Sequence, residues 1–294
     1  LKKNIHRKEI VSEVTQTGYQ QNFQDISMQI MDCKTLDDWR KVYRRLVHWE
    51  LELSNTGSSM ADILITQKEE ANNGFAKYVK TNYLNWVAEG ASTANGRPVM
   101  SPDLFKHSIF PLLDKGEKVF LVVLDNFRYD QWKMLESEIG DLFDIDEDMY
   151  ISILPTATQY ARNAIFSGLM PNKIAKMFPE LWVDEDEAEG KNLNEDLLIK
   201  TSADAEKLLE HFSQLSQNHL NVMVFNFIDM LSHARTESRM VRELANNESA
   251  YRSITISWFR HSILADLFKR LSQSDFTVVL TTDHGSIRAS KPVK

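Results

Sequence analysis

The sequence predicts an α/β fold with a doubly wound, mostly parallel sheet, preceded by a small all-α helical bundle. Two observations support this prediction. Apolar residues recur at helical spacing through the first ninety or so residues, whereas continuous apolar and β-branched runs alternate with helical stretches in the remainder. The chain has 294 residues, which is enough for one large α/β domain and a smaller companion domain.

Two segments near the N-terminus have the apolar spacing of helices that pack into a bundle. They run from Leu36 to Trp49 and from Ile63 to Trp86, and the run Asn-Thr-Gly-Ser-Ser at 55–59 separates them. Thr35 is the predicted N-cap of the first segment, because two aspartates follow it in the first turn, where the helix dipole favours negative charge. We interpret this bundle as structural or interfacial, because it contains no evident chemistry.

Four apolar runs in the second region are predicted strands. They are 118–124, 150–154, 222–228 and 276–282. Apolar residues at successive positions are typical of a strand that is buried on both faces of a parallel sheet. The predicted helices between these strands include 162–166 and 254–271.

The segment 88–102 is rich in Gly, Ser, Asn and Pro and marks the boundary between the two regions. We therefore predict a helical connector over 1–95 and an α/β domain over 96–294. The acidic run 183–190 is predicted to be a solvated loop. Because the chain begins with Leu1 rather than Met, we expect it to be part of a longer protein.

Composition narrows the functional classes. A formal net charge of −8 argues against non-specific binding along duplex nucleic acid, which needs clustered Lys and Arg. No stretch is apolar enough for a membrane span. The lone cysteine, Cys33, excludes an intramolecular disulfide and suits a reducing, cytoplasmic setting.

Polar residues follow each predicted strand, which is where ligands bind in open α/β sheets. Asp125 follows the first strand, and Thr156 and Thr158 follow the second. Asp229 ends the third strand and Asp283 follows the fourth. A single carboxylate after a strand is usually a helix cap or a turn residue. Polar groups of this kind after all four strands indicate a shared site.

Two of these aspartates have a histidine close by. Asp229 and His233 are four residues apart, so both side chains face the same way on a helix. Asp283 and His284 are adjacent. Aspartate and histidine without cysteine form a ligand set that suits zinc, manganese or a similar divalent ion. The alternative is that the aspartates cap helices and the histidines belong to the core.

Thr158 has a possible catalytic role at the start of a predicted helix. Its hydroxyl would lie at the positive helix terminus, which favours phosphate, and coordination to a metal would activate it as a nucleophile. Alternatively Thr158 only caps the helix, and Thr156 competes for either role. Arginines 128, 162 and 288 lie near these motifs, and we interpret them as surface or packing residues.

Five short motifs occur in order along the second region. They are Leu-Asp-Asn at 124–126, Pro-Thr-Ala-Thr at 155–158, Ser-Gly-Leu-Met-Pro at 167–171, Asp229 with His233, and Asp-His-Gly at 283–285. This order resembles the alkaline-phosphatase superfamily, and its nearest branch is the PglZ domain. The whole chain resembles PorX-type response regulators, in which a receiver domain, a helical connector and a PglZ domain follow one another. The resemblance implies a connector and a C-terminally incomplete PglZ domain, with the receiver absent.

The resemblance also implies two divalent metal ions, zinc being the expected one. One ion would be held by Asp125, Thr158, Asp283 and His284. The other would be held by Asp229, His233 and a later histidine, which these 294 residues lack. We therefore expect the chain as it stands to be less active than its parent, or inactive. The nucleophile implied by nucleotide pyrophosphatase/phosphodiesterases is Thr158, with Thr156 as the alternative.

The function that the resemblance implies is a zinc-dependent phosphoric ester or diester hydrolase of a two-component response regulator. Its substrates would be nucleotides or oligonucleotides, and we favour a diesterase because the nearest nucleophile pattern is a phosphodiesterase pattern. Its partners would be a sensor kinase and components of type IX secretion. The alternative is a signalling scaffold or dimerisation module, acting as a homodimer, with a structural or vestigial metal site.

Overall fold

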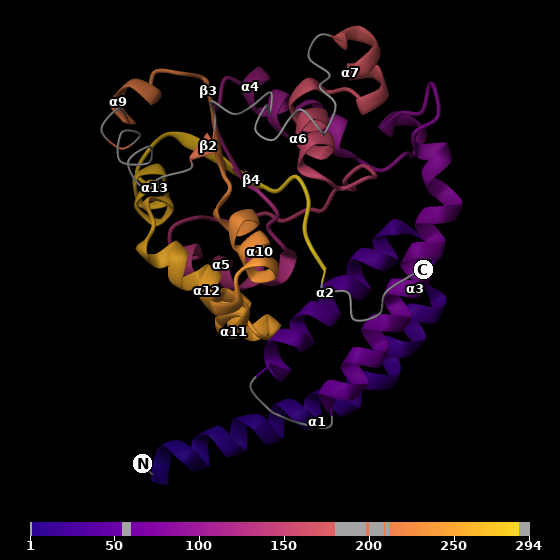
Figure 1. Ribbon diagram of the computed structural model, residues 1–294, viewed down its shortest axis with the longest axis vertical. Helices are drawn as coiled ribbons and strands as arrows, with labels where there is room; N and C mark the ends of the chain where they lie inside the picture. Colours follow the sequence, from indigo (N-terminus) through magenta and orange to yellow (C-terminus); the bar gives the residue numbers. More distant parts are fainter. Residues whose placement is uncertain (1, 55–59, 180–197, 200–208, 210–211, 288–294) are drawn as a thin grey trace. The chain divides into compact units, whose positions relative to one another are not determined.

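A computed structural model of the chain describes residues 2–54, 60–179, 198–199, 209 and 212–287 (Figure 1). The chain divides into two compact units, residues 1–98 and residues 99–294. Among the described helices, none is both long and apolar enough to cross a membrane. The predicted order of a helical region followed by a parallel α/β region is confirmed.

In its described residues the first unit consists mainly of three long helices. These are α1 (Lys2–Asp32), α2 (Leu36–Leu53) and α3 (Met60–Trp86), followed by the short 3-10 helix η1 (Thr93–Asn95). Each of the three long helices contacts the other two, and their shared core includes Tyr19, Trp39 and Leu46. The predicted break at 55–59 lies outside the described residues.

The start of α2 agrees with its predicted cap. The Thr35 hydroxyl accepts a hydrogen bond from the backbone N–H of Asp38, and the Asp38 carboxylate accepts one from the N–H of Thr35 at 2.9 Å. This reciprocal pair satisfies N–H groups that the first helical turn leaves without a partner in the helix. The prediction of Thr35 as an N-cap is therefore confirmed.

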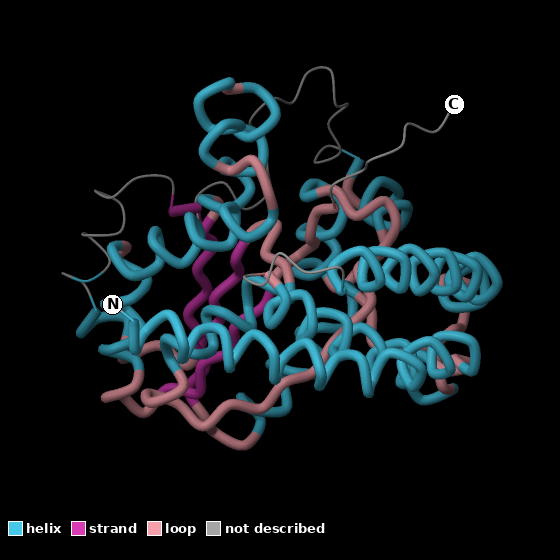
Figure 2. Tube along the Cα trace, turned by 90° about the horizontal axis from the view of Figure 1, so that it is seen from below, coloured by secondary structure: helices cyan, strands magenta, loops and turns pink. Residues whose placement is uncertain are grey.

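The second unit is built on a parallel sheet. Its strands are β1 (Lys118–Leu124), β2 (Leu198–Ile199), β3 (Leu220–Phe225) and β4 (Phe276–Thr281), in the order β2-β3-β1-β4. β1 is central, pairing in parallel with β3 on one side and with β4 on the other. Figure 2 shows these strands side by side in magenta. Because they are parallel, their carboxyl ends meet at one edge of the sheet.

Both faces of β1 are covered, which explains its continuous apolar sequence. Phe120, Val122 and Leu124 belong to a core that includes residues of α5, α12 and α13. Val119, Leu121 and Val123 pack on the opposite face of the strand. The helical segments of this unit are η2 (Ser101–Asp103), the π-helix η3 (Phe105–Ile109), α4 (Phe110–Asp114), α5 (Tyr129–Ile139), α6 (Thr158–Ser167), α7 (Pro171–Met177), α9 (Phe212–Leu215), α10 (Phe227–Glu237), α11 (Arg239–Leu244), α12 (Glu248–His261) and α13 (Ile263–Leu271).

The predicted strand at 150–154 is wrong. This segment is not part of the sheet, and only Ile151 forms an isolated bridge, to Met100. The Tyr150 hydroxyl instead donates to the backbone carbonyl of Thr282, and the Ser152 hydroxyl donates to that of Asp283 at 2.8 Å. The segment therefore supports the chain that leaves β4, and its side chains satisfy backbone groups there.

Two other predicted elements have different limits. The third strand ends at Phe225, and the residues from Phe227 onward form α10. The single helix predicted at 254–271 is wrong, because Ser262 is extended (φ −96°, ψ 159°) and separates α12 from α13. The Ser262 hydroxyl donates to the carbonyl of Phe259 at 2.9 Å and so satisfies the end of α12. The acidic run 183–190 lies outside the described residues.

Candidate metal centre

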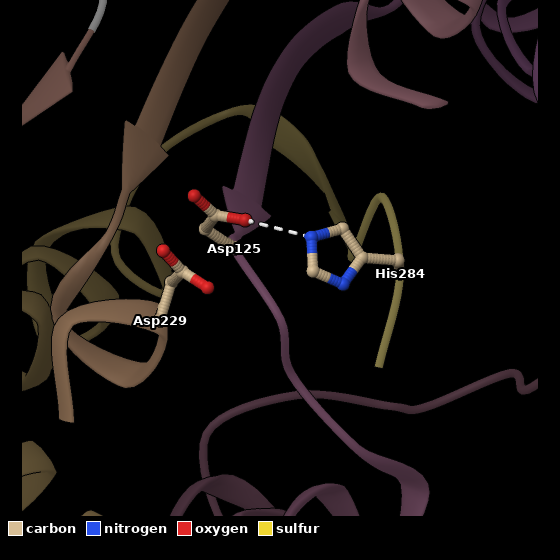
Figure 3. Close-up of side chains that lie close together, drawn as sticks. All are labelled: Asp125, Asp229 and His284. Carbon is tan, nitrogen blue, oxygen red and sulfur yellow. Dashed lines mark ion pairs between the residues drawn. The ribbon is translucent and has the colours of Figure 1, made fainter. Parts of the chain in front are cut away.

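Three side chains from different parts of the sequence meet at the carboxyl edge of the sheet. Asp125 directly follows β1, Asp229 lies in the first turn of α10 just after β3, and His284 follows β4. One ligand atom from each of them lies within 4.8 Å of the others. Figure 3 shows the two carboxylates and the imidazole facing a common point. We refer to these three residues as the Asp-Asp-His cluster.

The cluster places two carboxylates close together in a partly buried position. Asp125 is 3% exposed, and burial followed by the negative charge of Asp125 raises the pKa of Asp229 above its ordinary value. Asn126 donates from its side-chain amide to Asp229 Oδ1 at 3.1 Å, and its backbone is left-handed (φ 59°), a conformation that asparagine tolerates. A cation between the carboxylates would reduce their repulsion. The sequence places Asn126 in the motif Leu-Asp-Asn but predicts no role for its side chain.

Thr158 lies beside the cluster at the first position of α6, whose N-cap is Ala157. The Thr158 hydroxyl oxygen is 2.7 Å from His284 Nε2 and 3.3 Å from Asp125 Oδ1. His284 Nδ1 is 3.2 Å from the carbonyl oxygen of Gly285, so a proton on Nδ1 leaves the Nε2 lone pair facing Thr158. Thr156 is exposed, and its side chain has no hydrogen bond to any residue in the described ranges.

Asp283 is fully buried and lies beside the cluster. Its carboxylate accepts hydrogen bonds from the backbone N–H groups of Asn126 at 3.3 Å and His284 at 3.0 Å. Burial, followed by the charge of Asp125, raises the pKa of Asp283 to about 6. The N–H donors fix the carboxylate in place, and with it the turn that presents His284.

Arg162 joins Asp283 to Asp125. Its side chain is 1% exposed, forms an ion pair with the Asp125 carboxylate, and donates from Nε to Asp283 Oδ2 at 3.1 Å. Of the two roles expected for Arg162, surface residue or packing residue, only the surface role is therefore wrong. Its spacing offered a signal, because it lies four residues after Thr158 on the same helix, so both side chains share one face.

The remaining predicted residues lie farther from the cluster or outside the described part. His233 Nε2 is 3.4 Å from Asp229 Oδ2, but the His233 side chain is 67% exposed. Arg128 forms ion pairs with Asp130 and Glu248 rather than with the cluster. Arg288 lies outside the described residues. The structure thus brings together Asp125, Thr158, Asp229 and His284, with Asp283 beside them and His233 at the outer edge.

Two stretches of the chain match known families. Residues 104–294 match the BREX system PglZ alkaline phosphatase-like domain, and this match covers more than half of the chain. The chain belongs to the PglZ family. Residues 9–87 match the PorX response regulator linker domain, so a PorX-type linker precedes the PglZ domain. Among curated proteins, none matches the chain.

The family agrees with the chemistry of the Asp-Asp-His cluster. Alkaline phosphatase-like domains are usually metal-dependent, and this PglZ domain has two carboxylates and one imidazole arranged around one point. Such a donor set suits a divalent metal ion. The predicted resemblance to PglZ domains and PorX-type regulators is confirmed.

Proposed function

We propose that this PglZ domain is a zinc-dependent phosphoric diester hydrolase with Thr158 as its nucleophile. The observation that supports the proposal best is the position of the Thr158 hydroxyl, which is within hydrogen-bonding distance of two atoms of the Asp-Asp-His cluster. It also lies at the N-terminus of the ten-residue helix α6, where the helix dipole favours a phosphate group. Thr156 is the alternative nucleophile.

In this proposal Asp125, Asp229 and His284 hold a divalent ion next to Thr158. A bound ion of this kind polarises a phosphoryl oxygen and lowers the pKa of a neighbouring hydroxyl group. We propose Asp283 as a further ligand of this ion, and Asp229 with His233 as ligands of a second ion. Arg162 balances the negative charge of Asp125 and Asp283.

The proposed reaction forms a bond between the Thr158 oxygen and the phosphorus atom while the bond to the leaving group breaks. The hydroxyl proton has an acceptor within reach in Asp125 Oδ1, because the Nε2 lone pair of His284 would be occupied by the ion. Water then cleaves the bond between Thr158 and phosphorus, which regenerates the hydroxyl group and releases the phosphate.

We propose nucleotides or short oligonucleotides as substrates, and a role in a two-component system that regulates type IX secretion. The match of residues 9–87 to a response regulator linker supports the signalling part of this proposal. It also favours the second candidate function, in which the helical unit acts by protein contact as a scaffold or dimerisation module. The two functions are compatible, because the helical unit and the cluster belong to different compact units.

Hydrolysis of bis(p-nitrophenyl) phosphate tests the proposal. The longer parent protein that the sequence predicts is treated with EDTA, and turnover is measured with and without added zinc in the wild type, Thr158→Val and Thr156→Val. We expect zinc to restore turnover and Thr158→Val to lower kcat by about 10³-fold or more, because the nucleophile is removed. Thr156→Val is the matched control and keeps its activity, and equal melting temperatures exclude misfolding.

Each contrary result has a definite meaning. A wild type without zinc-dependent turnover rules out the hydrolase. Loss of activity in Thr156→Val alone moves the nucleophile to Thr156 and leaves the hydrolase in place.

A further inference from the structure

A cavity of about 510 Å³ in the second unit is lined by arginine side chains. Its lining includes Arg128, Arg235, Arg242, Tyr251 and Ser286, and within the described ranges it contains no aspartate or glutamate. Volumes of this size are typical of small-molecule sites. The lining therefore favours an anionic ligand.

Two segments connect this cavity to the Asp-Asp-His cluster. Helix α10 places Asp229 in the cluster, and Ser232 and Thr236 on the same helical face line the cavity. At about 1.5 Å of rise per residue, Ser232 lies roughly 5 Å and Thr236 roughly 10 Å along the helix from Asp229. After β4, His284 belongs to the cluster and Ser286 lines the cavity. A group roughly 5 to 10 Å from a phosphate at the cluster would therefore reach this cavity.

Two of the arginines that line the cavity, Arg128 and Arg235, are held in place by ion pairs and ring contacts. Arg128 and Arg235 both bind Glu248, at 2.6 and 2.9 Å, and both guanidinium groups lie over the ring of Tyr251, at 5.1 and 4.9 Å from its centroid. Arg128 also pairs with Asp130, which Arg252 binds at 3.0 Å. Two carboxylates, Asp130 and Glu248, thus bind Arg128, Arg235 and Arg252, and Arg242 adds a further positive charge to the cavity lining.

Arg242 supplies a charge that no carboxylate neutralises among the residues that the structure describes. Its guanidinium donates to the backbone carbonyl of Thr236 and forms no ion pair there. The nearby Arg239 on the same short helix differs, because it pairs with Glu243 at 3.0 Å and does not line the cavity. A planar guanidinium with free N–H groups is suited to bind phosphate oxygens.

We infer that the arginine cavity binds a second phosphate group of the substrate, so that this site prefers nucleotide diesters with a further phosphate next to the scissile one. The inference rests on the proposed hydrolase function, since that function places the first phosphate at the cluster. Arg242 is the residue that determines this preference, and Arg128 and Arg235, both bound to Glu248, also line the cavity.

Binding to the metal-free protein tests the inference without any turnover. Diadenylate with a 5′-phosphate and the same dinucleotide without it are titrated calorimetrically, in EDTA, into the wild-type chain, Arg242→Gln and Arg239→Gln. We expect the wild type to bind the phosphorylated form about tenfold more tightly, the size of one charge-assisted contact. This preference should disappear in Arg242→Gln and persist in Arg239→Gln, and equal melting temperatures exclude a folding defect.

The inference is overturned if the wild type binds the two dinucleotides equally or binds neither, or if Arg242→Gln keeps the preference. It is also overturned if Arg239→Gln loses the preference to the same extent, since bulk charge would then explain it. Hydrolysis of both dinucleotides by the longer parent protein, with added zinc, separates the two proposals. A binding preference without hydrolysis supports phosphate binding in the arginine cavity and rules out the hydrolase. Hydrolysis without a binding preference supports the hydrolase and rules out phosphate binding in the cavity.

Discussion

Arg162 has a buried guanidinium between two carboxylates, those of Asp125 and Asp283. Burial of a charge is unfavourable unless an opposite charge and hydrogen bonds accompany it. Here the guanidinium of Arg162 and the carboxylates of Asp125 and Asp283 provide these for one another. Without Arg162, two aspartates of like charge would remain in a region of low dielectric constant. Burial, followed by the charge of Asp125, raises the pKa of Asp283 to about 6 even with the arginine present.

We therefore predict that Arg162→Gln lowers the free energy of unfolding by about 3–5 kcal/mol, the usual effect of removing one partner from a buried ion pair. Urea denaturation measures the change. The control is Arg260→Gln, because Arg260 also binds a carboxylate in two places, that of Glu138 at 2.6 and 2.9 Å, but is 59% exposed. Arg260→Gln should lower the free energy of unfolding much less than Arg162→Gln, because solvent screens the exposed ion pair. Equal losses in the two variants would contradict a special role for the buried arginine.

For single residues, the sequence predicts the polar side chains that directly follow strands. It predicts less well the residues that pair with those side chains, such as Arg162. Asp125 and His284 follow β1 and β4, so their place at the sheet edge depends only on the strands being parallel. Arg162 has a partner 121 residues away, and the sequence offered only its spacing from Thr158. The left-handed backbone of Asn126 depends on the turn after β1, which no pattern in the sequence indicates. The proposed ligand set stays a prediction.

Among the elements, helices α5 and α12 are joined by buried polar contacts. Asp130 on α5 accepts a hydrogen bond from Arg252 on α12 at 3.0 Å, and Gln131 donates to Thr255 at 2.8 Å. Burial alone would raise the pKa of Asp130, but Arg128 and Arg252 outweigh burial and hold it below its ordinary value. The ionised form of Asp130 therefore stabilises the packing of the two helices.

This pKa shift predicts a pH dependence of stability. A carboxyl group whose pKa is lower in the folded state stabilises the protein above its unfolded pKa of about 4 and loses that effect as the pH falls through the folded value. The difference in unfolding free energy between wild type and Asp130→Asn should thus be largest near pH 7 and shrink below about pH 4. Urea denaturation at several pH values measures it. A difference that stays constant down to pH 3 would contradict the ionic role of Asp130.

Among the helices and strands, the apolar pattern of the sequence is enough to predict the limits of some elements but not of others. The limits 118–124 were predictable for β1 because neighbours on both sides and both faces require an unbroken apolar run. The segment 150–154 has a similar composition, but its backbone hydrogen-bonds to Val99 and Ser101 rather than to the sheet. Such a choice of partner is not encoded locally. The interruption at Ser262 was missed because the apolar spacing continues across it into α13.

For the whole molecule, each compact unit has a core of its own. Trp39, Val42 and Leu64 belong to the core of the helical unit, whereas the core of the second unit is built on β1. Every residue of the Asp-Asp-His cluster, Thr158 and the arginine cavity belongs to the second unit. The described residues that carry the proposed chemistry therefore all lie in the PglZ domain, and the helical unit carries most of the match to the response regulator linker.

The most direct test of the proposed function is an anomalous difference map, recorded at the zinc absorption edge from a zinc-soaked crystal of the chain. We predict an ion in contact with Asp125, Asp229 and His284, with the hydroxyl group of Thr158 facing it and Thr156 turned away. An ion bound elsewhere, an empty cluster at saturating zinc, or Thr156 in the place of Thr158 would contradict the proposed site.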